Sequence, residues 1–293
     1  MNKIPRELRR IGRQIKRVFI KEHKGMSDAE LESDRAMYER LNTDTRFKLG
    51  KKYDFICRFD KYAPNGSLDN QYFIQDIWGA RKVYENMPSV HYDVGSYVAG
   101  FIAHLLGMKQ KIVLIDIRKM NNNFDTNFLK EPRSVNGGGG QNRDSQGGIE
   151  YICADATNLE NIADESIESL SALCSVEHFG LGRYGDPINP NAWEQALKSF
   201  QRVLKKGGKL YFSVPVGQTS KVCFNAHRVF HPEIIIQTLD SMRLLEFGYI
   251  DGFDVKNVMR YESDGLKINQ NALTSIPEYD NNGTTGLFEF VKI

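Results

Sequence analysis

The sequence predicts an α/β protein built on a doubly wound, Rossmann-like sheet. Apolar runs that are typical of buried strands alternate with helical patterns from about residue 90 onward. These runs are nearly continuous, and they lack the alternation of polar and apolar residues that marks a sheet with one face in water. We therefore expect seven strands, mostly parallel and covered by helices on both faces of the sheet.

The expected elements follow one another in a regular order. A helical pattern over residues 71–87 precedes the first strand. Apolar residues at helical spacing predict a long helix over about residues 193–204, and a further helix over about residues 232–242. The strand candidates are residues 90–94, 111–116, 149–155, 169–175, 209–215, 244–250 and 286–293.

The chain is expected to have two parts, a basic N-terminal extension with a linker over residues 1–69 and a main domain over residues 70–293. Residues 121–148 stand where a crossover helix would be expected, but they contain four successive glycines and many Asn, Ser and Arg residues. That composition predicts a flexible insert or a lid.

The N-terminal segment concentrates positive charge. Residues 1–24 carry nine basic and two acidic side chains, a net charge of +7, so the total of +2 leaves −5 for the rest of the chain. Apolar residues recur among the basic ones at helical spacing, which predicts an amphipathic cationic helix. This helix could lie on an anionic membrane surface, dock on a partner chain, or pack on its own domain with its basic face in water.

Composition excludes several classes of protein. The mildly acidic main domain argues against nucleic acid as a partner, because a phosphate-tracking surface needs basic groups on the folded domain. No apolar run approaches the ~18 residues that a membrane span requires, so we expect a cytoplasmic protein. Its four cysteines form no CxxC pair and its histidines show no ligand spacing, which favours free thiols over a metal site or disulfides.

Polar residues stand at the end of each of the first four predicted strands. Ligands of a parallel sheet gather at these carboxyl ends, so the residues there are candidates for cofactor binding. A turn at Gly95 would open the next helix, and Asp116 follows it by 21 residues, the spacing at which a carboxylate accepts hydrogen bonds from ribose hydroxyls. The candidate cofactor-binding residues are Asp93, Gly95, Ser96, Asp116, Asp155, Ala156 and Ser175.

These residues predict a bound nucleoside, and the glycine spacing indicates which one. A dinucleotide site needs GxGxxG after the first strand so that the backbone can approach a pyrophosphate, but here the run is GSYVAG, with Tyr97 at the second glycine position. S-adenosylmethionine carries no phosphate, and its sulfonium cation suits a pocket lined by Asp93, Asp116, Asp155 and Glu177.

Six blocks of the sequence resemble the successive motifs of class I S-adenosylmethionine-dependent methyltransferases. They are DVGS, LID at the end of the second strand, CADATNL, SALCSVEH, RVLKKGGKLYFSVP and GLFEF. The blocks GLGRYGDP and FNAHRVF are similar to an uncharacterised methyltransferase-like family of bacterial surface-polysaccharide gene clusters and nematodes.

The resemblance implies a seven-stranded sheet whose last strand is antiparallel. It places Gly95 and Ser96 near the methionine part of the cofactor, Asp116 on the ribose, and Asp155 with Ala156 near the adenine. Tyr97 and Ala99 replace two glycines of the usual DxGxGxG pattern, so a narrower cofactor pocket is expected.

His178 is the candidate catalytic base, because an imidazole titrates near neutral pH and this one follows the fourth strand. Glu177 is expected to orient it, although the pair could instead only fix the turn by hydrogen bonds. Two polar segments are expected to hold the acceptor, or to be well-bonded loops. The candidate substrate-binding residues are Arg183, Tyr184, Asp186, Asn225, His227 and Arg228.

The sequence thus predicts methyl transfer from S-adenosylmethionine to a small polar acceptor, with O-methylation of a sugar hydroxyl in surface-glycan biosynthesis as the specific expectation. The acceptor could be a glycan or a nucleotide sugar. A non-catalytic methyltransferase-like scaffold that binds a partner through the basic helix is the main alternative. A nicotinamide-dependent oxidoreductase is disfavoured by the glycine spacing.

Overall fold

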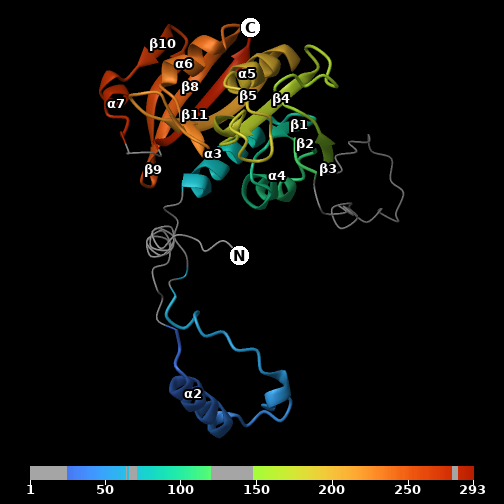
Figure 1. The fold of residues 1–293 in the computed structure, drawn as a ribbon, viewed down its shortest axis with the longest axis vertical. Helices are drawn as coiled ribbons and strands as arrows, with labels where there is room; N and C mark the ends of the chain where they lie inside the picture. Colours follow the sequence, from blue (N-terminus) through green and yellow to red (C-terminus); the bar gives the residue numbers. More distant parts are fainter. Residues whose placement is uncertain (1–24, 64, 66–70, 120–147, 279–282) are drawn as a thin grey trace, which may run out of the picture. The chain divides into compact units, whose positions relative to one another are not determined.

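In the computed structural model the chain divides into two units, Met1–Ser67 and Leu68–Ile293 (Figure 1). The structure describes residues 25–63, 65, 71–119, 148–278 and 283–293. The predicted basic helix within residues 1–24 lies outside this part of the chain, and so do residues 121–147 of the predicted insert.

The first unit contains the helix α2 (Asp28–Leu41) and the short 3-10 turn η1 (Lys51–Tyr53). Ser27 and Glu30 form a capping box at the start of α2, in which the Glu30 N–H donates to Ser27 Oγ and the Ser27 N–H donates to Glu30 Oε2. The Arg35 guanidinium donates to both oxygens of Asp54. No residue of α2 is buried, so polar contacts rather than an apolar core hold its described part.

The second unit is built on a nine-stranded sheet. In chain order its strands are β1 (His91–Val94), β2 (Ile112–Asp116), β3 (Ile149–Cys153), β4 (Ile167–Leu173), β5 (Leu204–Val216), β8 (Met242–Asp251), β9 (Asp254–Glu262), β10 (Gly265–Ile268) and β11 (Thr284–Lys292). Their order across the sheet is β10-β9-β8-β11-β5-β4-β1-β2-β3, as the labels of Figure 1 allow the reader to follow.

The α/β class and the parallel core of the sheet are confirmed. Strands β3, β2, β1, β4 and β5 are parallel neighbours, in the order of a doubly wound nucleotide-binding fold. Strand β11 lies between β5 and β8 and is antiparallel to both. The predicted number of seven strands was wrong, because β9 and β10 extend the sheet by further antiparallel pairs.

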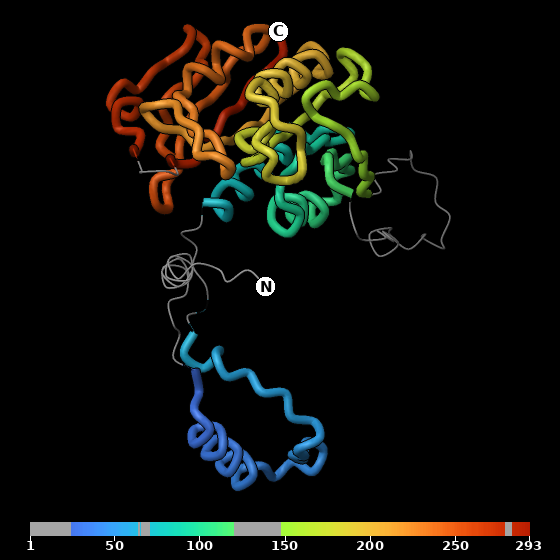
Figure 2. The backbone as a smooth tube through the Cα atoms, viewed as in Figure 1, coloured from blue at the N-terminus to red at the C-terminus, as the bar shows by residue number. Residues whose placement is uncertain are grey.

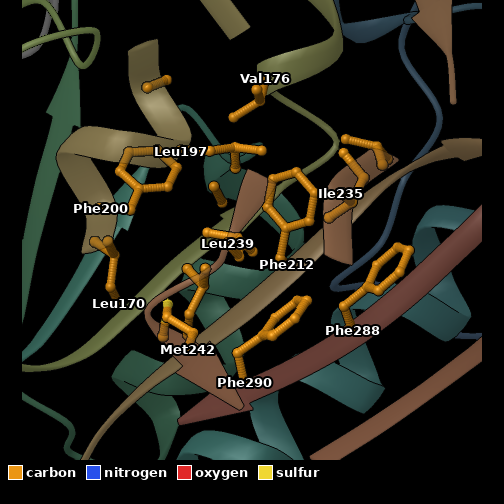
Figure 3. Packing of buried hydrophobic residues seen from close by; sticks show 14 of the residues in the cluster. Leu170, Val176, Leu197, Phe200, Phe212, Ile235, Leu239, Met242, Phe288 and Phe290 are labelled. Atoms are coloured by element: carbon orange, nitrogen blue, oxygen red, sulfur yellow. The ribbon is translucent and has the colours of Figure 1, made fainter. Parts of the chain in front are cut away.

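Helices cover both faces of the sheet. Helices α3 (Gln71–Asn86) and α4 (Ala103–Gly107) contribute to one buried apolar cluster, and α5 (Ala192–Val203) and α6 (Pro232–Thr238) contribute to the other. Successive residues of β5 alternate between these clusters, since Phe212 belongs to the second and Tyr211 to the first. Figure 3 shows Ile235 of α6 beside Phe212 in the second cluster, with Leu197 and Phe200 of α5 farther along the same cluster.

Shorter elements stand in the connections between the strands. They are the π-helix η2 (Val98–Ile102), the 3-10 turn η4 (Val176–His178), the hairpin of β6 (Lys221–Cys223) with β7 (His227–Val229), and the helix α7 (Gln270–Thr274). Figure 2 follows the backbone through these connections. Within the described ranges, no helix is both long and apolar enough to span a bilayer.

Candidate active site

Two adjoining cavities lie at the carboxyl ends of the parallel strands, where the strand order reverses between β1 and β4. The inner cavity is lined by Val94, Gly95, Asp116, Ile117, Ala154, Asp155, Ala156, Ser175 and Phe179, among others. The outer cavity is more open and is lined by Tyr72, Ser96, Tyr97, Lys119 and Tyr151, among others. Both are lined by Gly95, Asp116, Arg118, Cys174, His178 and Tyr184, so they form one continuous site.

The turn after β1 depends on Gly95. Its φ of +69° is in the left-handed region, and a Cβ there would lie 3.0 Å from the Cβ of Ser175. The Ser175 hydroxyl donates to the Val94 carbonyl over 2.7 Å and so ties the end of β4 to the end of β1. The two strand ends on either side of the topological switch point are therefore joined beneath the inner cavity.

Asp93 does not line either cavity, contrary to the prediction that it contacts a cofactor. Its side chain is 1% exposed and accepts hydrogen bonds from the hydroxyls of Ser171 and Ser96 and from the Ser96 N–H. Burial raises the pKa of Asp93 to about 6. Asp93 therefore fixes the turn, while Ser96 lines the outer cavity.

Tyr97 lines the outer cavity but not the inner one. Its side chain is 70% exposed, so the expected narrowing by this ring does not reach the inner cavity. Gly100 is the last glycine of the run GSYVAG. A Cβ on Gly100 would lie 1.9 Å from Oδ2 of the buried Asp76. The chain thus needs a glycine at position 100 to make room for a carboxylate of α3.

Asp116 ends β2 and points its carboxylate to Arg118. The Arg118 backbone N–H and Nε donate to Asp116 Oδ1 over 2.8 and 2.9 Å, and its Nη2 lies 2.6 Å from Oδ2. The same guanidinium lies 4.5 Å from the ring centroid of Tyr184, a cation–π contact. Asp116 and Arg118 line both cavities, so a carboxylate of fixed orientation stands at the junction.

Asp155 and Ala156, the residues predicted to lie near the adenine, follow β3 and line the inner cavity. Asp155 Oδ1 accepts a hydrogen bond from the Thr157 N–H over 2.8 Å, which holds the loop in a tight turn. Ala156 is buried, and its carbonyl accepts from the Ser199 hydroxyl of α5. Helix α5 therefore anchors this wall of the inner cavity.

His178 lines both cavities and is 8% exposed. Its Nδ1 lies 2.6 Å from the Ala226 carbonyl, and because a carbonyl only accepts, Nδ1 carries the proton and Nε2 is left as the basic nitrogen. Burial is the main cause that lowers the pKa of His178 to about 4. The imidazole is therefore neutral at neutral pH and able to take up a proton.

Glu177 does not line either cavity and does not orient His178 by a normal hydrogen bond. The two side chains approach to 3.5 Å between Glu177 Oε1 and His178 Nε2, which is beyond the usual range. Glu177 is 2% exposed, its Oε2 has no hydrogen-bond partner among the described residues, and burial raises its pKa to about 8. The Ala226 carbonyl, rather than Glu177, fixes the imidazole.

Glu177→Gln is expected to remove a loss of stability that the wild-type protein suffers as the pH rises. The folded-state pKa of about 8 lies above the usual 4.5, so Glu177 binds its proton more tightly in the folded state. The contribution of this proton to the free energy of unfolding is complete below about pH 4.5 and is lost as the pH rises through about 8. As the pH rises over this range, the free energy of unfolding of Glu177→Gln should increase relative to that of the wild type by on the order of a few kcal/mol.

Urea unfolding of both proteins at about pH 5 and about pH 9 measures this shift. Glu233→Gln on the surface of α6 is the matched control, since its side chain is 61% exposed and should show no such shift. A Glu177→Gln difference that is the same at both pH values would contradict the expectation.

The predicted acceptor-binding residues separate into two groups. Tyr184 lines both cavities and Asp186 lines the inner one. Asp186 also accepts hydrogen bonds from the N–H groups of Gly180, Gly182 and Tyr184, which holds this loop in place. Tyr184 packs its ring against the edge of the His178 ring at 5.4 Å between centroids.

The second group does not line either cavity and consists of Arg183, Asn225, His227 and Arg228. Arg183 donates to the Ala226 carbonyl over 3.0 Å. Arg228 is 6% exposed and donates to the carbonyls of Phe179 and Pro190, so it supports the turn that carries His178. The segment FNAHRVF thus supplies a backbone carbonyl and internal support to the site.

The site also contains residues that the sequence did not single out. Arg118, Cys174 and Tyr72 line the cavities, and Tyr72 reaches them from α3. Burial is the main cause that raises the pKa of Tyr72 to about 12. An arginine two residues after a strand-ending aspartate was the available signal for Arg118, whereas nothing local indicates Tyr72.

Known proteins resemble parts of this chain. A family model described as "Caenorhabditis protein of unknown function, DUF268" matches residues 152–280. No curated protein sequence matches the chain.

Among solved structures, the [4+2]-cyclase SpnF has a TM-score of 0.47 at 12% identity, covering 74% of this chain and 81% of its own. The Burkholderia thailandensis 1,6-didemethyltoxoflavin-N1-methyltransferase, solved with bound 1,6-didemethyltoxoflavin and S-adenosylhomocysteine, has a TM-score of 0.46 at 11% identity, covering 74% of this chain and 78% of its own. An S-adenosylmethionine-dependent methyltransferase of Methanosarcina mazei has a TM-score of 0.45 at 14% identity over 72% and 97%.

Proposed function

We propose that this protein transfers the methyl group of S-adenosylmethionine to a hydroxyl of a small polar acceptor, namely a sugar. The supporting observation is the convergence of Gly95, Asp116, Asp155 and His178, from four different strand ends, on one continuous site at the topological switch point. A nucleoside cofactor fits this position, because Asp116 Oδ2, which accepts one hydrogen bond from Arg118, has a second acceptor position for a ribose hydroxyl, and because a glycine turn lets the backbone approach.

The choice of S-adenosylmethionine over a dinucleotide rests on the β1 turn. Only Gly95 has a left-handed φ there, Tyr97 occupies the position of the second glycine, and η2 begins at Val98. This turn offers no glycine-lined cradle for a pyrophosphate. The inner cavity carries Asp116, Asp155 and Asp186 against Arg118, a balance that suits a cation more than a phosphate, although Asp93 and Glu177 do not contribute as expected.

The chemistry that these residues must support is simple. Bound S-adenosylmethionine would supply a methyl carbon that the acceptor oxygen attacks while the carbon–sulfur bond breaks and its electron pair stays on sulfur. His178 Nε2 takes the hydroxyl proton, and the Ala226 carbonyl holds the ring through Nδ1. Tyr184 and Tyr72 line the walls around His178, and the protein otherwise acts by holding the acceptor in place.

The choice of a sugar acceptor and of surface-glycan biosynthesis rests on the resemblance of GLGRYGDP and FNAHRVF to a family of surface-polysaccharide gene clusters. A hydroxyl acceptor is consistent with a neutral imidazole at the site, because an alcohol must lose a proton during methylation whereas a thiolate need not.

Calorimetric titration with S-adenosylhomocysteine and with NAD tests the cofactor, and Asp116→Asn sharpens the test. The wild-type protein should bind S-adenosylhomocysteine and not NAD. Asp116→Asn should weaken that binding by about 10-fold or more, because charge-assisted hydrogen bonds to the ribose are lost.

Asp254→Asn, an exposed carboxylate at the start of β9, is the control and should bind as the wild type does. Binding of NAD alone would favour an oxidoreductase. Failure to bind either compound would favour a non-catalytic scaffold over an enzyme.

We also propose that residues 1–24 hold the protein, in the cytoplasm, on an anionic membrane surface. Their nine basic and two acidic side chains should give salt-sensitive binding to vesicles that contain anionic lipid, and none to neutral vesicles. Deletion of residues 1–24 should abolish this binding in a vesicle sedimentation assay. Equal sedimentation after the deletion would exclude the proposal.

A further inference from the structure

We infer that the acceptor carries an anionic group, a phosphate or a carboxylate, which Lys119 holds in the outer cavity beside the hydroxyl to be methylated. This inference rests on the proposed function and names the substrate class of the same site. It is carried by the charges and hydrogen-bond donors that line the outer cavity.

The charges of the outer cavity are unequal. Among the described residues that line the outer cavity, Asp116 is acidic and Arg118 and Lys119 are basic. Arg118 occupies both oxygens of Asp116 with its own hydrogen bonds, so these two charges largely cancel. Lys119 therefore leaves an excess of positive charge at the wall of the cavity.

The uncharged lining adds donors. Tyr72, Tyr97 and Tyr184 line the outer cavity, and the raised pKa of Tyr72, about 12, keeps its hydroxyl protonated at neutral pH. The buried Glu177 lies outside the lining and adds no carboxylate to it. A cavity with excess positive charge and several hydroxyl donors favours an anionic acceptor over a neutral one.

The aromatic walls fit the rest of such an acceptor. Tyr184 makes cation–π contacts with Arg118 and Arg183, whose guanidinium carbons lie 4.5 and 5.1 Å from its ring centroid. Tyr97, whose side chain is 70% exposed, adds to the outer cavity an aromatic ring of the kind that a sugar or a base packs against. The phosphate of a nucleotide sugar and the carboxylate of a sugar acid share the required chemistry.

The test uses the full-length protein saturated with S-adenosylhomocysteine and three probes. UDP-glucose tests phosphate, an oligosaccharide of glucuronate units tests carboxylate, and a glucose oligosaccharide of equal length carries no charge. Calorimetry should show that at least one anionic probe binds about 10-fold or more tightly than the neutral one, with an affinity that falls as salt is added.

Lys119→Ala should weaken binding of that anionic probe by about 10-fold, and Lys119→Glu should weaken it further, with no change in affinity for S-adenosylhomocysteine. Lys267→Ala, on β10 and paired with Asp264, is the matched control and should change neither affinity.

Equal binding of charged and neutral probes, no binding of either anionic probe, or full affinity in Lys119→Ala would overturn the inference. These outcomes leave the proposed function standing as long as S-adenosylhomocysteine binds. Loss of that first binding step would instead remove the proposed function itself.

Discussion

His178→Gln is expected to reduce the rate of methyl transfer by about 100-fold or more, while the affinity for S-adenosylhomocysteine stays within about twofold. The variant loses the basic Nε2 that would accept the hydroxyl proton. The glutamine amide can still donate to the Ala226 carbonyl, so the shape of the η4 turn should persist. We expect the low end of the usual range for a general base, because a pKa of about 4 makes this imidazole a weak base.

The measurement is the initial rate of S-adenosylhomocysteine release with the best acceptor from a panel of nucleotide sugars and acidic oligosaccharides. His104→Gln, an exposed residue of α4 that lines neither cavity, is the control and should be as active as the wild type. Full activity in His178→Gln would exclude His178 as the base. A loss of cofactor affinity that matches the loss of rate would assign it to binding instead.

Phe288→Ala is expected to lower the free energy of unfolding by about 3–5 kcal/mol, the usual cost of removing a fully buried phenyl ring. Phe288 stands in β11 with 0% exposure. Its ring stacks on Phe247 of β8 at 4.3 Å between centroids and lies 6.0 Å from Phe212 of β5 and from Phe290. Figure 3 shows Phe288 in line with Phe290 along β11 and beside Phe212.

Equilibrium unfolding in urea measures this loss as a lower midpoint with a similar slope. Phe253→Ala is the control for the loss of an aromatic ring as such, because Phe253 is 69% exposed in the β8–β9 turn and its removal should cost less than about 0.5 kcal/mol. A change below about 1 kcal/mol for Phe288→Ala would mean that the three strands do not share one packed core.

The sequence predicts most of the sheet because its buried strands are short apolar runs that end in polar residues. Strands β1, β2, β4 and β5 are such runs, and their helices repeat apolar residues at helical spacing. Strand β9 was not predicted because its sequence, DVKNVMRYE, is a polar segment with few buried positions. Strand β10 was not predicted because it consists only of GLKI. Strands that pack only one side against a core carry too few apolar residues for this signal.

The candidate site is predictable only in part, because a polar residue at a strand end can face a ligand or its own turn. Asp116 and Asp155 face the cavity, whereas Asp93 binds the hydroxyls of Ser96 and Ser171. The sequence offers the same evidence for Asp93, Asp116 and Asp155, namely an aspartate at the end of a predicted strand. Arg228 shows the same limit, since its burial under the η4 turn depends on the hairpin of β6 and β7 and not on its neighbours in sequence.

The place of β11 in the sheet has a consequence for biosynthesis. Strand β11 (Thr284–Lys292) lies between β5 and β8. A nascent chain that has not yet emerged from the ribosome beyond residue 284 therefore has β5 and β8 with unpaired edges, and the apolar residues that β11 would cover are exposed. Such edges invite pairing with other chains. Translation arrested before β11 should therefore yield an aggregation-prone intermediate that stays bound to chaperones. This holds even though the strands around the candidate site have already been synthesised.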